Sequence, residues 1–410
     1  MYCIVQCSGQ WQSLETGYTG TVSSVHFISS DIGFYPGGNA IYKTIDGGRN
    51  WMRYVIEDGN TYELRSIHFP SPMVGYVVGE TVYKTTNAGL SWDSLYTLSN
   101  RNEGDLSVVK FVRFADPVHG MIGLIGSPLY TQDGGSKWAM TGSTFESPTW
   151  NYDVSILDGG VAIIGGWNPN GAGDFGMIAK STDNGETWVG ISDNQLFFES
   201  MQIRSVFFHN AMRGWVAGSR ISVGRPYSSM RVMFTTDGGE TWDSPNMMFP
   251  ATVNCIRFAN ELVGFIGDED GMIYSTVDGG VTWIPENAET FGRAVKDICI
   301  VNGSVVYVTG ESGFMLKRSI VANVDKKSED QELSIFPNPS SGRVNFTSSV
   351  ENGDPYDCLI EIMDSFGRVA YTNFKIAKLL TLDLSSLPKG MYFVRVRTGH
   401  NVQIIALSLI

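Results

Sequence analysis

The stretch YKTIDGGRNW at residues 42–51 recurs five more times along this chain of 410 residues. Counted back from its closing Trp, every copy has Ser or Thr at position −7, Asp or Asn at −5 and Gly at −3. The other copies end at Trp92, Trp138, Trp188, Trp242 and Trp283. Recurrence in one register predicts a repeat architecture.

The chemistry of this stretch is that of a tight β-hairpin. The hydroxyl residue ends one strand, the acidic side chain accepts backbone N–H groups across the turn, and Gly adopts positive φ. The Trp opens the next strand, and we expect its ring to pack against the neighbouring repeat. We therefore predict structural, non-catalytic roles for Asp46, Asn87, Asp133, Asp183, Asp237 and Asp278.

These copies resemble the Asp-box, or BNR repeat, of sialidase-like and related β-propellers. Two further strand signals precede each box, such as LRSIHF (64–69) followed by GYVVG (75–79). Together with the two strands of the box they make four strands per repeat, which is the content of one propeller blade.

The last repeat predicts how the ring closes. Residues 295–318 supply three strand signals and no box, whereas Trp11 lies 40 residues before Trp51, in register with the other repeats. We expect the N-terminal strand at 11–14 to complete this blade and so remove two exposed sheet edges. The predicted fold is an all-β, seven-bladed β-propeller with N-terminal strand closure, followed by a small Ig-like β-sandwich.

Residues 11–319 resemble the propellers of photosystem II stability and assembly factor-like proteins. They also resemble the propellers of xyloglucan-type glycoside hydrolases, which have two such domains. The resemblance implies the fold and is nearly silent about function, because one fold supports many functions.

The C-terminal segment resembles the type A C-terminal sorting domain of the type IX secretion system. The matching residues are FPNPSSG (336–342), the turn from Asp364 to Arg368, and the close from Leu387 to Arg395. The chain departs from the family pattern in having no Lys or Arg after Arg397. The resemblance implies a Gram-negative source, export through the periplasm and a secreted or outer-membrane surface location.

We expect four segments. Residues 1–10 are an export-signal remnant or a disordered N-terminus, 11–319 the propeller, 320–331 a charged linker and 332–410 the sorting domain. The longest apolar runs are too short for a transmembrane helix. A net charge of −13 argues against a nucleic-acid partner. The scattered cysteines predict buried thiols without disulfides, and we expect a monomer without cofactor or metal.

Alignment of the first strand of each repeat shows a basic position. Its second residue is basic in four of the six aligned strands: Arg65, Lys110, Arg204 and Lys296. Equivalent positions of a closed ring converge on its axis, so we predict a basic cluster that binds a carboxylate-bearing partner. The alternative is that each cation pairs with a neighbouring acid.

Two long connections, 165–177 and 218–232, are predicted on the face opposite the boxes. Their candidate ligand-binding residues are Trp167, Asn168, Asp174, Arg225 and Tyr227, a mixture suited to stacking and hydrogen bonding. The alternative is that both are surface insertions without function.

Catalytic signals are weak. The arginine motif of sialidases is absent, and the best carboxylates for a glycosidase, Asp268, Glu269 and Asp270, are expected to form one solvated turn. We therefore expect a non-enzymatic surface module that binds a protein or polysaccharide and is exported by the type IX machinery. The alternative is a secreted glycoside hydrolase or sialidase-like enzyme.

Overall fold

The computed structural model describes residues 10–56, 63–98, 109–142, 150–168, 175–191, 201–220, 231–244, 249–320, 333–336, 338, 340–348, 358–364, 369–373, 379–398 and 401–409. The chain divides into two compact units, one of Gly9–Ile320 and one containing Val321–Ile410. The expected export-signal remnant and most of the expected linker lie outside the described residues. In the described part of the chain, no helix has the length and apolar character needed to cross a membrane.

The first unit is built of antiparallel sheets that follow one another along the chain. Six of the seven sheets found within its described residues take their strands in sequence order. They are β2 (His26–Phe27), β3 (Gly33–Gly37), β4 (Ala40–Thr44) and β5 (Met52–Val55); β6 (Ser66–His68), β7 (Gly75–Val78), β8 (Thr81–Thr85) and β9 (Asp93–Thr97); β10 (Phe111–Phe114), β11 (Gly120–Gly123), β12 (Leu129–Thr131) and β13 (Ala139–Met140); β14 (Trp150–Ile156), β15 (Ala162–Asn168), β16 (Phe175–Ser181) and β17 (Val189–Gly190); β18 (Met201–Phe208), β19 (Gly214–Arg220) and β20 (Arg231–Thr235); and β21 (Val253–Phe258), β22 (Gly264–Asp268), β23 (Ile273–Thr276) and β24 (Ile284–Pro285).

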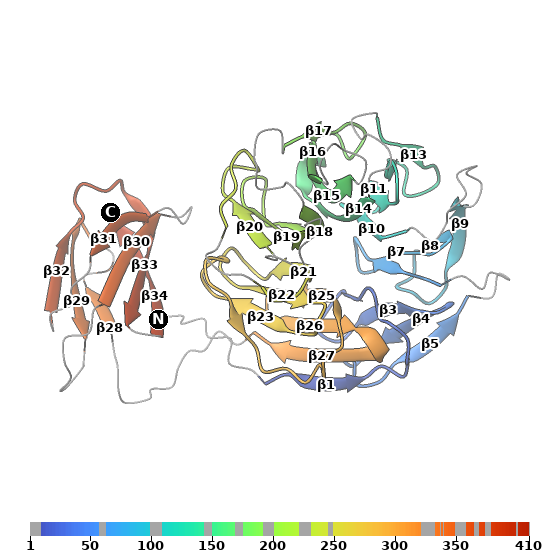
Figure 1. The fold of residues 1–410 in the computed structure, drawn as a ribbon, viewed down its shortest axis with the longest axis horizontal. Helices are drawn as coiled ribbons and strands as arrows, with labels where there is room; N and C mark the ends of the chain where they lie inside the picture. The colour runs from blue at the N-terminus through green and yellow to red at the C-terminus, as the bar shows by residue number, and fades with distance from the viewer. Residues whose placement is uncertain are drawn as a thin grey trace. The chain divides into compact units, whose positions relative to one another are not determined.

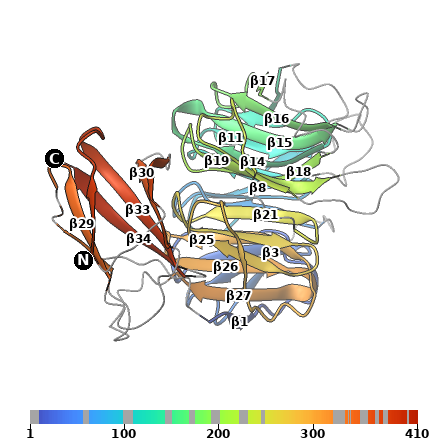
Figure 2. The same ribbon diagram turned by 60° about the vertical axis from the view of Figure 1, so that its left-hand side comes forward.

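The remaining sheet of this unit joins the two ends of the repeat region. Its order is β1 (Gln12–Glu15), β27 (Phe314–Ser319), β26 (Val305–Gly310) and β25 (Val295–Val301). Strand β1 runs antiparallel to β27, with Gln12 opposite Lys317 and Glu15 opposite Phe314. Figure 2 shows these four strands side by side. The N-terminal strand therefore pairs with the last repeat as predicted, over 12–15 instead of the expected 11–14.

Figure 1 shows the sheets of the first unit arranged around a common centre, with β10, β14, β18 and β21 close to it. The predicted all-β propeller fold is confirmed. Two short 3₁₀ helices, Asp158–Gly160 and Glu311–Gly313, interrupt the strands.

Aromatic rings hold neighbouring sheets together. Tyr76 of β7 stacks on Phe114 of β10 with ring centroids 3.6 Å apart, and Trp215 of β19 stacks on Phe258 of β21 at 3.7 Å. Tyr307 of β26 stacks on Phe27 of β2 at 3.6 Å, which joins the last sheet to the first. Stacked pairs of this kind stabilise beyond the area that they bury.

The box Trp residues pack against the neighbouring repeat, as predicted: Trp242 shares a buried core with Ile163 and Ile178 of the preceding sheet. They also make a contact within their own sheet. Trp51 meets Phe27 edge-on within its own sheet, at 6.0 Å between ring centroids. The same contact within one sheet is made by Trp92, Trp138, Trp242 and Trp283. The aromatic residue of the second strand, such as Tyr76 or Trp215, adds a ring stack between repeats.

The second unit has two sheets. One has the order β28 (Leu333–Phe336), β29 (Arg343–Ser348) and β32 (Leu379–Asp383). The other has the order β31 (Val369–Asn373), β30 (Cys358–Asp364), β33 (Gly390–Thr398) and β34 (Asn401–Leu409). Val344 and Leu382 of the first sheet share one buried core with Ile362 and Val394 of the second. This is the predicted β-sandwich.

Candidate functional site

Each box is a turn that satisfies its own polar groups. In the fifth copy, Thr235 donates its hydroxyl to Asp237 Oδ1 over 2.7 Å and accepts the N–H of Gly239 over 2.9 Å. Asp237 Oδ1 also accepts the N–H of Thr241 over 2.9 Å. The corresponding side chains make these bonds in the other copies, at Asp46, Asn87, Asp133, Asp183 and Asp278. Bonds of this kind occupy the carboxylates in the turn.

The basic position of the first strands coincides with a β-bulge. The ladder to the second strand shifts register at Tyr152, Arg204, Asn254 and Lys296. A bulge leaves one residue outside the pairing and re-aims its side chain. A glycine of the second strand makes room for the bulged backbone, because a Cβ on Gly218 would lie 1.8 Å from the carbonyl oxygen of Gln202.

Two of the predicted cations, Lys110 and Arg204, lie against the ring of Tyr152, and the charge of Arg65 acts on Lys110. Lys110 Nζ is 5.8 Å from the ring centre of Tyr152, and the Arg204 guanidinium is 4.9 Å from the same ring. Burial lowers the pKa of Lys110, and the neighbouring charges of Arg65 and Arg204 lower it further. Such cation–π contacts stabilise a cation without neutralising it.

Two tryptophans extend this group. Lys110 Nζ is 5.7 Å from the ring centre of Trp150, and the rings of Trp150 and Trp167 meet edge-on at 5.8 Å across β14 and β15. We call Arg65, Lys110, Trp150, Tyr152, Trp167 and Arg204 the basic–aromatic cluster.

The remaining residues of the basic position have protein partners. Lys296 Nζ lies 3.3 Å from Glu311 Oε1, so this predicted member faces an acid rather than joining the other three. Asn254 donates its side-chain N–H to the carbonyl of Val295 over 2.9 Å. Within the cluster, Arg65 Nη2 lies 3.9 Å from Glu63 Oε2, and Arg204 donates to Gln202 Oε1 over 3.1 Å.

Several predicted residues fall outside this description. Asn168 ends β15, but its side chain is not among those described, and Asp174, Arg225 and Tyr227 lie outside the described residues. Tyr152 was not predicted as a site residue. Alignment of NYDVSI (151–156) with the other first strands places Tyr152 at the basic position, so the sequence alone could have identified it.

Deeper along the first strands, side chains bond to the backbone of the next sheet. Asp297 Oδ2 accepts the N–H of Val25 over 3.0 Å, Ser24 that of Ile67 over 3.3 Å, and Ser205 that of Ile256 over 3.2 Å. Ser66 and Asp153 do the same for Val112 and Val206. Each such bond satisfies an N–H on the free edge of a sheet.

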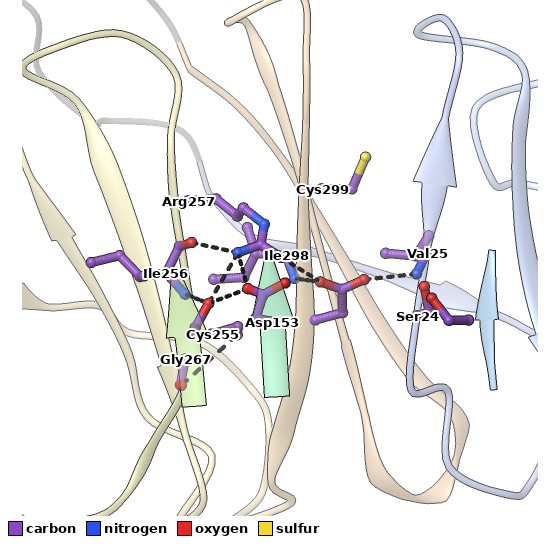
Figure 3. A network of polar contacts seen from close by, with 12 residues as sticks. Ser24, Val25, Asp153, Cys255, Ile256, Arg257, Gly267, Ile298 and Cys299 are labelled. Atoms are coloured by element: carbon purple, nitrogen blue, oxygen red, sulfur yellow. Dashed lines mark hydrogen bonds and ion pairs between the residues drawn. The ribbon is translucent and has the colours of Figure 1, made fainter. Parts of the chain in front are cut away.

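An ion-pair network lies within this layer (Figure 3). Arg257 Nη1 is 3.0 Å from Asp153 Oδ2 and from Ser205 Oγ, and Arg257 Nη2 is 3.9 Å from Asp297. Burial lowers the pKa of Arg257, but the facing carboxylates of Asp153 and Asp297 outweigh it and leave that pKa above its ordinary value. Because Arg257 lies between the carboxylates of Asp153 and Asp297, the network holds sheets together.

Two histidines of this layer are neutral. The rings of His26 and His68 meet edge-on at 4.9 Å. Burial, with the charge of Arg113, lowers the pKa of His26 to about 3, and burial lowers the pKa of His68 well below its ordinary value. His68 Nδ1 accepts the N–H of Phe114 over 3.2 Å. A neutral imidazole that accepts a backbone bond serves packing.

The acidic turn expected at Asp268, Glu269 and Asp270 is exposed at Glu269 and Asp270, but Asp268 departs from the expectation. Asp268 is fully buried, and its Oδ1 accepts the N–H groups of Asp270 and Met272 over 3.1 and 2.7 Å. Burial raises the pKa of Asp268 to about 6. The described residues contain no group of three or more His, Cys, Asp or Glu arranged to hold a metal ion. Asp268 therefore organises its own turn.

Fold and cluster together define a β-propeller unit with a basic–aromatic cluster, and a second unit that is a β-sandwich. Residues 4–144 match the family model for photosynthesis system II assembly factor YCF48, and residues 334–407 match that for the secretion system C-terminal sorting domain. The sorting domain of the type IX system marks the chain as a secreted or outer-membrane surface protein.

Known proteins agree with the propeller fold. The photosystem II assembly lipoprotein Ycf48 of Synechococcus sp. (strain CC9902) is 27% identical over 165 residues, which are 40% of this chain. The match spans 44% of the length of that curated relative. YCF48 bound to D1 peptide superposes with a TM-score of 0.59 at 16% identity, over 77% of this chain and 99% of the other. YCF48 from Cyanidioschyzon merolae gives 0.58 at 17% identity, over 75% and 98%.

Proposed function

We propose that this chain is an exported β-propeller that binds an acidic protein or peptide at the basic–aromatic cluster. The observation that carries the proposal is the placing of Lys110 and Arg204 against Tyr152, with the charges of Arg65 and Arg204 both acting on Lys110. Among the described residues, the carboxylate within ion-pair distance of these three cations is that of Glu63, 3.9 Å from Arg65 Nη2. Half-buried cations that repel one another gain from an incoming anion.

The aromatic rings suit the same ligand. Trp150 and Tyr152 already stack against the cations, so their remaining surface offers apolar contact beside the charge. A peptide with Asp or Glu next to apolar residues uses both. The solved structure of YCF48 with a D1 peptide is an example of a peptide complex on this fold, and it supports the choice of a peptide as ligand.

The test is a binding titration with a labelled peptide of alternating Glu and Leu, against the same peptide with Gln in place of Glu. The double variant Lys110→Ala, Arg204→Ala should bind the Glu peptide at least about tenfold more weakly, equivalent to about 1.4 kcal/mol. Higher salt should weaken the wild type, because exposed charges are screened within about 8–10 Å at physiological ionic strength.

Lys137→Ala is the matched control, because Lys137 is an exposed cation of the third box turn. Equal affinity of the double variant and the wild type refutes the site. If polygalacturonate binds more tightly than the Glu peptide, the ligand is a glycan and the proposal of a protein ligand is wrong. Release of reducing sugar from polysaccharides or sialosides, lost in Asp270→Asn, establishes the enzyme alternative.

A further inference from the structure

The opening motif of the sorting domain, residues 336–342, is bonded to the last strand of the chain. Asn338 Oδ1 accepts the N–H of Ser408 over 3.0 Å. The N–H of Ser340 donates to the carbonyl of Ser408 over 2.8 Å, and Ser340 forms a parallel bridge with Leu409. The motif and β34 are thus in direct contact although about 70 residues of chain separate them.

Local bonds fix the shape of the motif. The side chain of Ser340 is buried, and its hydroxyl donates to the carbonyl of Arg343 over 2.7 Å and accepts the N–H of Gly342 over 3.1 Å. Gly342 has φ of +123°, and a Cβ there would lie 2.8 Å from Ser385 Cα. This position therefore requires glycine. The Ser-x-Gly end of the motif forms a rigid support for Asn338 and for the N–H of Ser340.

Strand β34 needs such a support at its end. It is the outermost strand of its sheet, where it pairs with β33 from Asn401 to Leu409. Both outward polar groups of Ser408 bond to the motif, while Leu407 and Leu409 are buried in the core of the sandwich. The outward groups of an edge strand are otherwise open to water or to another strand. The motif therefore clamps the end of β34 in register.

We propose that Asn338 and Ser340 are positioning residues of the export signal, which present the end of β34 to the secretion machinery in one fixed register. Strand β34 has no Lys or Arg, so its charge gives the machinery no point of attachment. The machinery can then recognise β34 only by its backbone and by the shape of its side-chain surface. Both depend on register, because a one-residue slip of a strand moves every side chain to the opposite face. Motif and last strand are then recognised as one element.

The test uses the full-length chain in a bacterium with a type IX system. Asn338→Ala removes the acceptor for Ser408, whereas Asn338→Asp keeps it. We expect Asn338→Ala to raise the periplasmic fraction at least about threefold and Asn338→Asp to restore surface delivery. Hydrogen exchange of the purified chain should show faster exchange of the amides of 401–409 in the Ala variant alone. Thr381→Ala is the control, because it removes an exposed side-chain bond to Asn345 on the other sheet.

A second variant approaches the same bond from β34. Ser408→Pro removes the N–H that Asn338 accepts, and the outward direction of that N–H leaves the ladder to β33 intact. If Asn338→Ala unfolds the whole domain, the amides of β30 will also lose their protection from hydrogen exchange. Ser408→Pro then still tests the proposal. Unchanged exchange of 401–409 in both variants refutes the clamp. Faster exchange with normal delivery refutes the positioning role, and so does mislocalisation of Thr381→Ala to the same extent.

Discussion

At the residue scale, the box shows which chemical property its acidic position needs. Asn87 stands in the second copy where the others have Asp, and its Oδ1 still accepts the N–H of Ser91 over 3.0 Å. Its amide group donates to the hydroxyl of Ser91 over 2.8 Å. The position therefore requires an oxygen acceptor of fixed reach, and a negative charge only strengthens the bonds.

We predict that Asp237→Ala destabilises the propeller by about 2 kcal/mol, because two backbone or hydroxyl donors of the turn lose their acceptor. Asp237→Asn should cost less than about 1 kcal/mol, since Asn87 shows that an amide fits the turn. Denaturant unfolding of both variants measures the difference. Equal losses for Ala and Asn would show that the charge and not the acceptor is needed.

Asp268 predicts a dependence of stability on pH. Its pKa is raised by burial to about 6 from an ordinary 3.8, so the native state holds the proton more tightly than the unfolded chain does. The stabilisation is complete below pH 3.8 and is lost as the pH rises through about 6. As the pH rises from 3.8 to above 6, ionisation of Asp268 should lower the free energy of unfolding by on the order of 2–3 kcal/mol.

Asp268→Asn keeps an acceptor for the N–H groups of Asp270 and Met272 and removes the titration. Unfolding free energies of the variant between pH 4 and 7 should therefore vary less than those of the wild type. Asp270→Asn serves as the control from the exposed part of the same turn. A wild-type slope that survives in Asp268→Asn would assign the titration to another group.

At the scale of elements, the first strand of each sheet has a free edge that the preceding sheet covers. The side chains of Ser24 and Ser66 accept N–H groups of the sheet that follows, and Asp297 accepts the N–H of Val25 between the last sheet and the first. Strand β1 covers β27 in the last sheet. We propose that this pairing closes a ring of seven blades.

Deletion of residues 11–14 should leave the edge of β27 unpaired and remove the buried side chain of Leu14. We expect the melting temperature to fall by roughly 5 °C or more, with aggregation on heating. Gln12→Ala, which changes one exposed side chain and keeps the backbone pairing, should leave the melting temperature nearly unchanged. An unaltered transition in the deletion variant would disprove the closure by β1.

At the scale of the whole molecule, the proposed binding site and the sorting domain belong to separate units. The basic–aromatic cluster lies within Gly9–Ile320, whereas the sorting domain has its own core of Val344, Ile362 and Val394. A unit with its own hydrophobic core can fold without its neighbour.

We predict that deletion of residues 332–410 leaves the propeller folded and able to bind the acidic peptide, but retained in the periplasm. Fractionation of cells and a thermal melt of the purified fragment measure the two properties. Delivery of the truncated chain to the surface would contradict the export role of the sorting domain, and loss of the propeller's own transition would contradict its independence.

The sequence by itself determined the features that depend on neighbouring residues. The box turn is made by bonds between residues two and four apart, such as those of Thr235 with Asp237 and Gly239, so a local pattern predicts it. Repetition of the pattern then predicts a propeller, and the motifs at 336–342 and 387–395 predict the sorting domain.

Only the tertiary structure decided which side chains meet across repeats. It placed Tyr152 between Lys110 and Arg204, gave Lys296 the carboxylate of Glu311, and buried Asp268. These outcomes depend on bulges in the first strands and on contacts between segments tens of residues apart. A pattern of residue types fixes a register, but the direction of a side chain follows from the backbone that surrounding sheets impose.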